Sequence, residues 1–450
     1  MDKSEIRNEE RGKLGFVELW AIGIGQVIGA GVITLIGPAI ALTGYSVWLA
    51  YFVAVCLGAV TNLPIIIFSS VTKFSGGDYS VITTLGGQKA GGMYIVGFSL
   101  QMLGMSLFAT ALGMYVTSII PGADGKLIGV IALIFFYFVN LLGIANMARL
   151  QKLMSAVLIA ALMMFIVVGA TKADFSHSFN FLEEGFFSSG GKGFWSAVML
   201  LVYSCQGYKF NANYGSQTLN PTRNLPRSML AVVPVLMVVY SGAALIGSTV
   251  LPLEMVAGQP LTLAARTILP NALFFAFIIG GPIMALLTTI NSTFGAFVGP
   301  FTKAANDGWF TKKLARTNSR GGAYVILTIE LILGLIPVLL DFSVGQIVNN
   351  VMLVSTAYNF ILYYSLLKTP DMMPGKWAHA ALHTNRAVFY TIMAAAFVTQ
   401  AVIGWNSIKS LTAPLAAFNI AALAVCFIYA IARHASGKTH VDTEGMVELN

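Results

Sequence analysis

The residue least expected from its surroundings is Lys209, in the stretch VYSCQGYKFNANYGSQ over residues 202–217. The first part of this stretch is apolar enough to lie inside a membrane, yet Gly207, Asn211 and Asn213 flank the lysine. An ionised side chain within an apolar span usually faces a cavity or a partner. A lysine facing a cavity would attract a carboxylate and repel a cation. If burial leaves the amine neutral, it would instead alternate between two protonation states and couple protons to transport.

Two other interpretations of Lys209 compete with a cavity role. Its ammonium group would extend to the membrane surface only if that surface were near, but Asn220 and Pro221 lie about twelve residues on. At 1.5 Å per residue the gap is roughly 15 Å or more, and the side chain covers about 6 Å of it. An internal ion pair would need a carboxylate, for which Glu330 in ILTIELIL is the candidate by type. Glu330 itself is expected to be peripheral, near the cytoplasmic end of its span.

A second group of polar side chains consists of Thr288, Thr289, Ser292 and Thr293. Their hydroxyls would suit a sodium ion, or they would bond to backbone carbonyls, as Ser and Thr commonly do in membrane helices. The three cysteines lie far apart, and the five histidines are expected in loops or the tail, so no disulfide framework or metal site is predicted. No nucleophile–base pair or phosphate-binding loop is present. We therefore expect no enzyme activity, no ATP-driven step and no cofactor.

The elements that must position these residues are membrane spans. The chain has 450 residues, of which 57% are hydrophobic and 10% charged, and its mean hydropathy is +0.78. A soluble domain is closer to a quarter charged. Apolar runs of about 20 residues mark transmembrane helices. Twelve are expected, at 15–42, 45–71, 91–119, 126–145, 151–170, 193–216, 228–250, 270–301, 322–340, 345–367, 386–405 and 411–432.

The basic residues predict the orientation of these spans. An even number of spans puts both termini on one side of the membrane. Twenty of the 26 lysines and arginines then fall on the side of the termini, five fall on the other side, and the last is Lys209. Because positive charge accumulates in cytoplasmic loops, both termini are expected in the cytoplasm, with the chain in the cell (inner) membrane. This distribution also accounts for the net charge of +8 without nucleic acid.

Two of the spans contain features that favour a break in the helix. Gly23, Gly25, Gly29 and Gly31 crowd the first, around QVIGAG, and each glycine weakens a helix by about 1 kcal/mol relative to alanine. Close packing of helices would also explain these glycines. In the alternative, the helix unwinds and its free backbone groups line a cavity, as in transporter sites. The sixth span offers the counterpart at YSCQGYK. A half-helix N-terminus suits a carboxylate and exposed carbonyls suit an ammonium, so together they would bind the head group of an α-amino acid.

Breaks in spans one and six predict two five-helix repeats of opposite orientation. The expected organisation is a cytoplasmic tail over 1–14, a first repeat over 15–170, and an inverted second repeat over 193–367. Two additional helices follow over 386–432, and a second cytoplasmic tail covers 433–450.

Four motifs now resemble those of one family. IGAGVI over 28–33, FSGGDYS over 74–80, LNPTRNLPRS over 219–228 and KAANDGWF over 303–310 run in order across the first ten spans. The chain is identified by them as a member of the amino acid–polyamine–organocation superfamily, which has the leucine-transporter fold. Its GPFTKAANDGWF segment is similar to the eighth-helix ending of basic amino-acid antiporters, such as the arginine–agmatine exchangers.

The resemblance implies a substrate site between helices one, three, six and eight, with a pocket wall from helix ten. Backbone and side chains of helix one would bind the head group, Tyr203 and Phe294 would be aromatic gates, and the carbonyl of Gln206 would face the substrate amine. Phe108 and Met352 would form pocket walls. The implied substrate-binding residues are Gln26, Val27, Ala30, Gly31, Phe108, Tyr203, Gln206, Lys209, Phe294 and Met352.

The departures from the family pattern bear on specificity and coupling. Those antiporters carry a glutamate where this chain has Lys209, so the sign of the charge is reversed. Gly299 replaces an arginine found elsewhere in the superfamily. Leu158 falls where some relatives carry a lysine that stands in for sodium, and Lys152 is too near the cytoplasm for that role.

The sequence therefore predicts a secondary active transporter that moves amino acids by alternating access. Neutral zwitterions are expected first and acidic ones second, by proton symport or by amino-acid/amine exchange. The alternatives are a polyamine or basic amino-acid antiporter and a sodium-coupled symporter. A channel or a non-transporting receptor is the least favoured interpretation. The expected partners are an amino acid or amine, membrane lipid and a coupled proton, with a homodimer left open and nucleic acid excluded.

Overall fold

The computed structural model describes residues 13–448 except 30, 121, 184, 341–343 and 410–412. Within helices it leaves out the side chains of 118, 344–353, 414 and 415. The described chain is built of helices, and the one β contact among these residues is an isolated bridge between Leu14 and Thr218. The expectation of an all-α membrane protein is confirmed.

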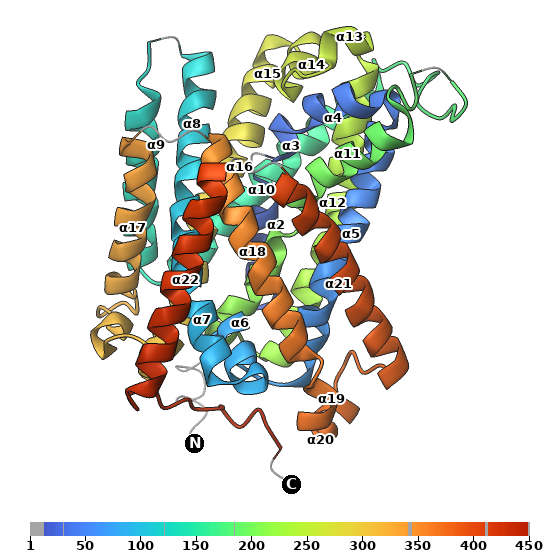
Figure 1. Ribbon diagram of the computed structural model, residues 1–450. Coiled ribbons are helices and arrows are strands. Elements are labelled where there is room, and N and C mark those ends of the chain that lie inside the picture. The colour runs from blue at the N-terminus through green and yellow to red at the C-terminus, as the bar shows by residue number, and fades with distance from the viewer. Residues whose placement is uncertain are drawn as a thin grey trace, which may run out of the picture.

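The helices follow one another along the chain (Figure 1), mostly with short connections, and a longer connection over 171–189 joins α10 to α11. The first group is α2 (Phe16–Val27), α3 (Gly31–Thr34), α4 (Ile36–Thr43), η1 (Gly44–Ser46), α5 (Val47–Val71), α6 (Asp78–Val81), η2 (Ile82–Gly86), α7 (Gln88–Phe98), η3 (Ser99–Gly104), α8 (Met105–Ile119), α9 (Gly125–Leu141) and α10 (Ile144–Ala170). The second group is α11 (Gly190–Val202), η4 (Tyr203–Cys205), η5 (Gly207–Gln217), α12 (Pro221–Thr249), α13 (Leu253–Val256), α14 (Leu261–Ile268), α15 (Asn271–Ile278), η6 (Ile279–Ile283), α16 (Met284–Asn306) and η7 (Lys312–Ala315). The third group is α17 (Tyr324–Leu339), α18 (Val344–Leu366), α19 (Thr369–Met372), α20 (Pro374–Ala378), α21 (Arg386–Lys409) and α22 (Ala413–Ala435).

Each of the twelve predicted spans corresponds to helices of this series. Among the described residues, eight helical stretches are long and apolar enough to cross a membrane. The shorter apolar helices α9 and α17 are two more of the predicted spans. The remaining two correspond to α18 and to the interrupted run from α11 to η5. The first and last described segments lie at the same end of the bundle, since Lys13 and Glu444 line one surface pocket there, as an even number of spans requires.

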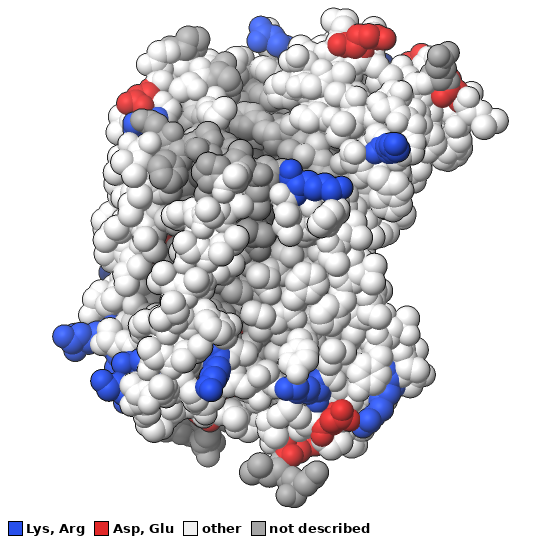
Figure 2. Space-filling model, viewed as in Figure 1, with Lys and Arg blue, Asp and Glu red and all other residues white. Residues whose placement is uncertain are grey.

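The charged side chains mark the two ends of the bundle. On the face seen in Figure 2, lysine, arginine and the acidic residues gather toward the two ends and leave an uncharged belt between them. An apolar belt bounded by charged ends is what a bilayer core requires of the surface it contacts. The short helices α13 and α14, which the sequence analysis missed, lie at the end opposite the chain termini (Figure 1).

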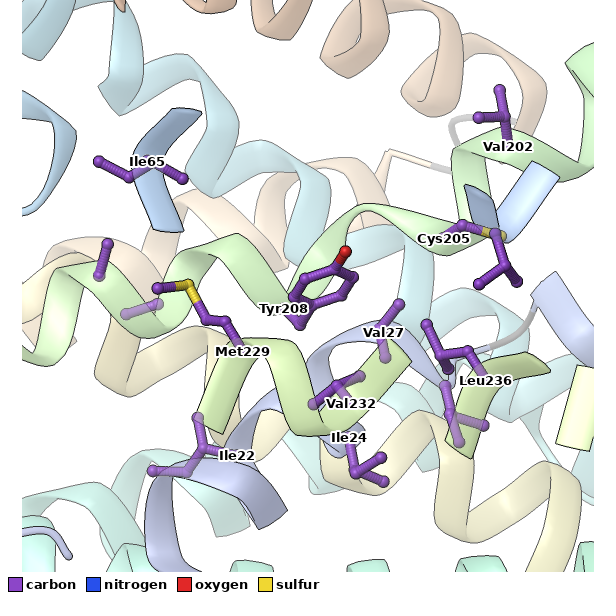
Figure 3. Packing of buried hydrophobic residues seen from close by; sticks show 14 of the residues in the cluster. Ile22, Ile24, Val27, Ile65, Val202, Cys205, Tyr208, Met229, Val232 and Leu236 are labelled. Atoms are coloured by element: carbon purple, nitrogen blue, oxygen red, sulfur yellow. The ribbon is translucent and has the colours of Figure 1, made fainter. Parts of the chain in front are cut away.

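The first helix of the bundle is the best covered by its neighbours. α2 packs against α10, α12, α16 and η5. Figure 3 shows apolar side chains of α2, such as Ile24 and Val27, packed with Tyr208 of η5 and Val232 of α12. The interruption that follows α2 is therefore enclosed by protein, which is where non-helical backbone is tolerated at membrane depth.

Candidate functional site

The first predicted break is present at the expected residues. α2 ends at Val27 and helical structure resumes at Gly31. Ile28 has φ −83° and ψ 80°, which is outside the helical region, and the N–H of Gly29 bonds to the carbonyl of Val27 at 3.0 Å instead of one four residues back. Ile28 and Gly29 are thus outside any helix, and the prediction of a broken first helix is confirmed.

The second break lies in the sixth span, as expected. α11 ends at Val202, a single 3₁₀ turn covers Tyr203–Cys205, and Gln206 belongs to no helix. The chain then continues as the 3₁₀ helix η5. A 3₁₀ segment of 11 residues is unusually long and indicates local strain or a hinge.

The two breaks touch each other directly. A Cβ at Gly207 would clash with the carbonyl oxygen of Gln26 and would lie 2.9 Å from its carbonyl carbon. Glycine is thus required at 207 because backbone meets backbone there. The hydroxyl of Tyr240, from α12, lies 2.8 Å from the carbonyl oxygen of Val27 and 3.1 Å from that of Ser204. One tyrosine therefore joins the two unwound segments.

A cavity of about 180 Å³ opens where the two breaks meet. It is large enough for the head group and side chain of a small solute. Seven of the ten predicted substrate-binding residues line it, namely Gln26, Val27, Gly31, Phe108, Tyr203, Gln206 and Lys209. Ala30 and the side chain of Met352 lie outside the described residues.

Phe294 is the predicted residue that the structure places elsewhere. Its side chain is fully buried among Met105, Leu286 and their neighbours, in an apolar cluster beside the cavity. Phe297, one helical turn further along α16, lines the cavity instead. The register of α16 therefore brings Phe297 to the face on which the resemblance placed Phe294.

Two amide atoms at the cavity, one from each of two glutamines, lack a hydrogen-bond partner among the described residues. The Oε1 atom of Gln26 and the Nε2 atom of Gln206 are buried and make no hydrogen bond within the described part of the chain. The other amide atom of Gln26 donates to the carbonyl of Ser292 at 3.3 Å, which fixes the side chain. Because buried polar groups are normally paired, a free acceptor and a free donor lining one cavity indicate a polar ligand.

Lys209 lines the same cavity, and its ammonium group has polar and aromatic neighbours from other parts of the chain. Its ammonium group hydrogen-bonds the side-chain oxygen of Asn359 in α18. Asn359 in turn donates to Gln400 of α21 at 3.0 Å. The Asp78 carboxylate of α6 interacts electrostatically with the ammonium group, and the ring of Phe210 lies 5.7 Å from it. The lysine is thus neither extended to the membrane surface nor paired with Glu330.

The position of Glu330 differs from the one expected from the sequence. It was expected to be peripheral, yet its side chain has no exposed surface. The helical period places it on the face of α17 that also carries the buried residues Ile326, Leu327 and Gly334. An apolar run with one carboxylate does not reveal which face of its helix is buried, and this is why the sequence analysis misjudged it.

A family model described as amino acid permease matches residues 14–434. The chain belongs to the amino acid permease family. Family membership places it among transporters rather than enzymes, and its many spans fit a protein of the cell membrane.

The individual relatives of this permease are distant. The branched-chain amino acid permease BcaP of Lactococcus lactis is 24% identical over 53% of this chain and 56% of its own length. The protein of the same name from Bacillus subtilis is 25% identical over 57% and 59%, respectively. The serine/threonine exchanger SteT of Bacillus subtilis is 25% identical over 51% and 52%. The matches thus cover between half and two thirds of these relatives, and none of the three is named as a basic amino-acid antiporter.

The hydroxyls of α16 in this permease bond to backbone. The Thr289 hydroxyl donates to the Gly25 carbonyl of the first helix at 2.8 Å and lies at the same distance from Ala285. The hydroxyls of Thr288, Ser292 and Thr293 reach carbonyls one turn back in their own helix. Two roles were expected for these hydroxyls, sodium binding and hydrogen bonding to backbone carbonyls. The structure shows the hydrogen bonds to backbone carbonyls.

Gly31 allows two segments of the chain to pack closely together. A Cβ at this position would lie 2.5 Å from the Cβ of Ser204, the residue after the gate candidate Tyr203. The glycine therefore lets the second half of the first helix approach the sixth span. Close packing, one of the two alternatives weighed from the sequence, therefore applies at Gly31, and the same residue lines the cavity.

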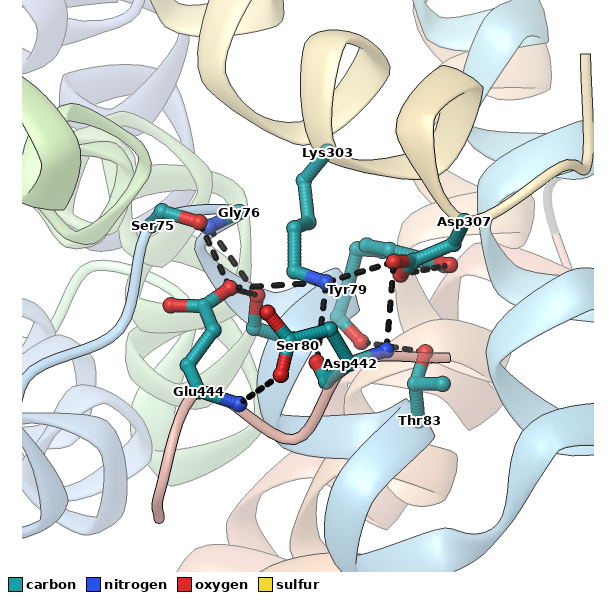
Figure 4. Close-up of polar contacts among 9 residues, drawn as sticks. All are labelled: Ser75, Gly76, Tyr79, Ser80, Thr83, Lys303, Asp307, Asp442 and Glu444. Carbon is teal, nitrogen blue, oxygen red and sulfur yellow. Dashed lines mark hydrogen bonds and ion pairs between the residues drawn. The ribbon is translucent and has the colours of Figure 1, made fainter. Parts of the chain in front are cut away.

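Two family-like motifs meet below the cavity, at the end that carries the termini. Figure 4 shows Lys303 of KAANDGWF between Asp307 and residues of FSGGDYS. The ammonium group of Lys303 lies 2.6 Å from the carboxylate of Asp307, which also accepts from the hydroxyl of Tyr79 at 2.8 Å. Glu444, from the C-terminal tail, accepts from Ser75 at 2.6 Å. These motifs thus hold each other and the C-terminal tail together at this end, and the residues named here do not line the cavity.

Aromatic rings lie between this end of the bundle and the cavity. Phe98, Phe210 and Phe297 line the cavity, with ring centroids 4.8 Å apart for Phe98 and Phe297 and 6.3 Å apart for Phe98 and Phe210. Phe301, one turn further toward Lys303, stacks on Phe98 at 6.0 Å. The structure therefore has a cavity with a thick aromatic floor on the side of the chain ends.

Several residues of the site were missed from the sequence. Tyr240 lies in an apolar run, and nothing in its spacing distinguishes it from a packing aromatic. Asn359 and Gln400 carried a detectable signal, because uncharged polar residues within apolar spans tend to bond across helices. Gln151 of α10 is a similar case, since it accepts from Asn291 at 2.7 Å beside the first helix.

Proposed function

We propose that this permease is a secondary transporter of amino acids that works by alternating access. The single observation that carries the proposal is the cavity at the junction of two unwound helices, with an unpaired amide oxygen on Gln26 and an unpaired amide nitrogen on Gln206. A zwitterionic head group offers both an ammonium donor and a carboxylate acceptor. The Gln26 oxygen suits the ammonium and the Gln206 nitrogen suits the carboxylate.

Neutral amino acids are proposed as the main substrates and acidic ones as the second class. The cavity wall is largely aromatic and aliphatic, as in Phe108, Phe297 and Ile403, which suits an apolar side chain. Lys209 adds a positive charge that opposes a cationic side chain. The names of the relatives, which concern branched-chain amino acids and serine or threonine, support the same order.

The resemblance to basic amino-acid antiporters would instead predict a cationic substrate or a polyamine. Lys209 stands against that alternative, although the nearby Asp78 offsets part of its charge. A sodium-coupled mechanism is also disfavoured, because the hydroxyl of Thr289 and the carbonyl of Gly25 bond directly to each other. We therefore favour proton symport or exchange.

The proposed orientation has both termini in the cytoplasm. The excess of basic residues on the side of the termini supports this assignment. With that orientation, the aromatic floor and the Lys303–Asp307 pair close the cytoplasmic path, and transport would require them to separate. The two five-helix repeats, over 15–170 and 193–367, are the units proposed to move against each other.

Counterflow in proteoliposomes tests the proposed function. Vesicles loaded with unlabelled leucine should accumulate labelled leucine, and serine, threonine or glutamate in the lumen should be ranked by their ability to drive that uptake. Gln26→Leu should abolish counterflow, whereas Gln259→Leu, a matched change at an exposed glutamine, should leave it unchanged. Failure of every neutral and acidic amino acid to exchange would refute the proposal. Current without counterflow would identify a channel, and binding without counterflow would identify a receptor.

A further inference from the structure

Glu330 is a buried carboxyl group without a partner. Its side chain has no exposed surface, and neither carboxyl oxygen has a hydrogen-bond partner among the described residues. It lies within the helix α17 and not at either helix end. An ionised carboxylate in such surroundings would be penalised by several kcal/mol unless it were paired. Burial without a partner therefore favours the neutral carboxylic acid form of Glu330 over the ionised carboxylate.

Among the described residues, no cation of the neighbouring helices forms an ion pair with Glu330. α17 packs against α8, α9, α16, η3 and η7. The titratable residues on those elements are Tyr115, Lys126, Tyr137, Lys303, Lys312 and Lys313. Lys126, Lys312 and Lys313 are exposed, and Lys303 is paired with Asp307. Tyr137 bonds to Thr328 at 2.9 Å. Within the described part of the chain, no ion pair includes Glu330.

One titratable group from another element does interact with Glu330. It is Tyr214, which belongs to η5, the inner half of the broken sixth span. The hydroxyl of Tyr214 donates to the carbonyl of Ser292 at 2.6 Å. The amide of Gln26 donates to the same carbonyl at 3.3 Å. Because Gln26 lines the cavity, hydrogen bonds connect the cavity through the Ser292 carbonyl to Tyr214. From Tyr214 to Glu330 the link is electrostatic, with no hydrogen bond between them.

We propose that Glu330 binds and releases the proton that is coupled to amino-acid transport. The proposal rests on the proposed function and names its coupling ion. In the state seen here the carboxyl holds the proton. When the elements packed against α17 separate, water reaches the carboxyl, and COOH + H₂O gives COO⁻ + H₃O⁺ on that side of the membrane. The carboxylate stays hydrated while access changes to the opposite side of the membrane, where it takes up a proton. The dry, buried state forms again only after that step, because burial of the unpaired anion is unfavourable.

The substrate is linked to this proton through Gln26. A head group that engages the free oxygen of Gln26 fixes the amide, and with it the contacts that Gln26 and Tyr214 share at the Ser292 carbonyl. Substrate and proton would thus favour the same closed arrangement, and by linkage each should promote binding of the other.

The test compares wild type, Glu330→Gln and Glu330→Asp in proteoliposomes that contain a pH-sensitive dye. Gln imitates the neutral acid but cannot release a proton. We expect leucine to drive proton movement in the wild type, and Glu330→Gln to lose it by at least tenfold while retaining counterflow. Glu330→Asp should restore part of the proton movement. Glu254→Gln, the same change at an exposed carboxylate, is the matched control and should behave as wild type.

The outcomes distinguish this inference from the proposed function. Loss of counterflow in the wild type would refute the proposed function itself. Normal counterflow with unchanged proton movement in Glu330→Gln would overturn the role of Glu330, as would counterflow without any proton movement in the wild type. Infrared difference spectra provide a readout that does not depend on transport. The carboxylic-acid C=O band should be weaker in Glu330→Gln than in wild type, and identical bands would also overturn the inference.

Discussion

Replacing Lys209 should change the charge preference of the cavity. In the Lys209→Met and Lys209→Glu variants we expect basic amino acids to bind more tightly than they bind the wild type. The physical reason is that the ammonium group lines the cavity, so a cationic substrate side chain comes close to it. A sphere of about 180 Å³ is about 7 Å across, which limits how far the two charges can separate.

The size of the effect follows from that separation. Two unit charges about 6 Å apart, at an effective dielectric constant near 20, interact by about 3 kcal/mol, or about a hundredfold in affinity. The carboxylate of Asp78 offsets part of this repulsion. We therefore expect arginine to gain about tenfold to a hundredfold in Lys209→Met, and more in Lys209→Glu. Affinity for glutamate should fall in both variants, and affinity for leucine should change little.

The assay is a thermal-shift titration of purified protein with leucine, glutamate, arginine and agmatine, repeated from pH 5 to 9. A ligand that binds only the folded state raises the melting temperature in proportion to the stabilisation. Lys192→Glu, which makes the same charge change at an exposed position of α11, should leave all four affinities unchanged. Tight binding of arginine or agmatine to the wild type would refute the reasoning. So would a loss of leucine binding in Lys209→Met, because the lysine would then bind the head group instead of selecting the side chain.

Three further substitutions test the joined breaks. Gly207→Ala should abolish transport, because its Cβ would clash with the Gln26 carbonyl, while Gly191→Ala, where a Cβ meets open space, should be normal in counterflow. Tyr240→Phe removes the hydroxyl that joins two carbonyls and should lower stability by about 1–3 kcal/mol, measured by thermal unfolding; an unchanged melting temperature would contradict that role. Tyr203→Ala should reduce uptake more than Tyr203→Phe, because a gate needs the ring and the hydroxyl adds about 1 kcal/mol; equal losses would point to the hydroxyl.

The sequence predicted the spans and both breaks because these features are local. An apolar run of about 20 residues and a group of glycines leave a clear pattern along the chain. The break near Gly29 and the one at Gln206 were both placed at the correct residues. The seven predicted residues that line the cavity lie on those breaks or follow from the family resemblance.

What the sequence left open depends on which face of a helix meets which neighbour. Phe294 and Phe297 are three residues apart, and only the packing of α16 decides which one reaches the cavity. The hydrogen-bond partner of Lys209 comes from α18, 150 residues further on, and no pattern near Lys209 points to Asn359. Glu330 was misjudged for the same reason, since a carboxylate in an apolar run does not tell whether its face is covered.

The contact between Gly207 and Gln26 has a consequence for how substitutions combine in this permease. Since backbone meets backbone there, and Tyr240 joins the same two segments, a shift of either segment must displace the other. Two single changes, one in residues 26–31 and one in residues 203–207, should therefore not add in free energy, whereas distant pairs should. Engineering a new specificity in this cavity would then mean redesigning both segments together, as one recognition unit assembled from two distant parts of the chain.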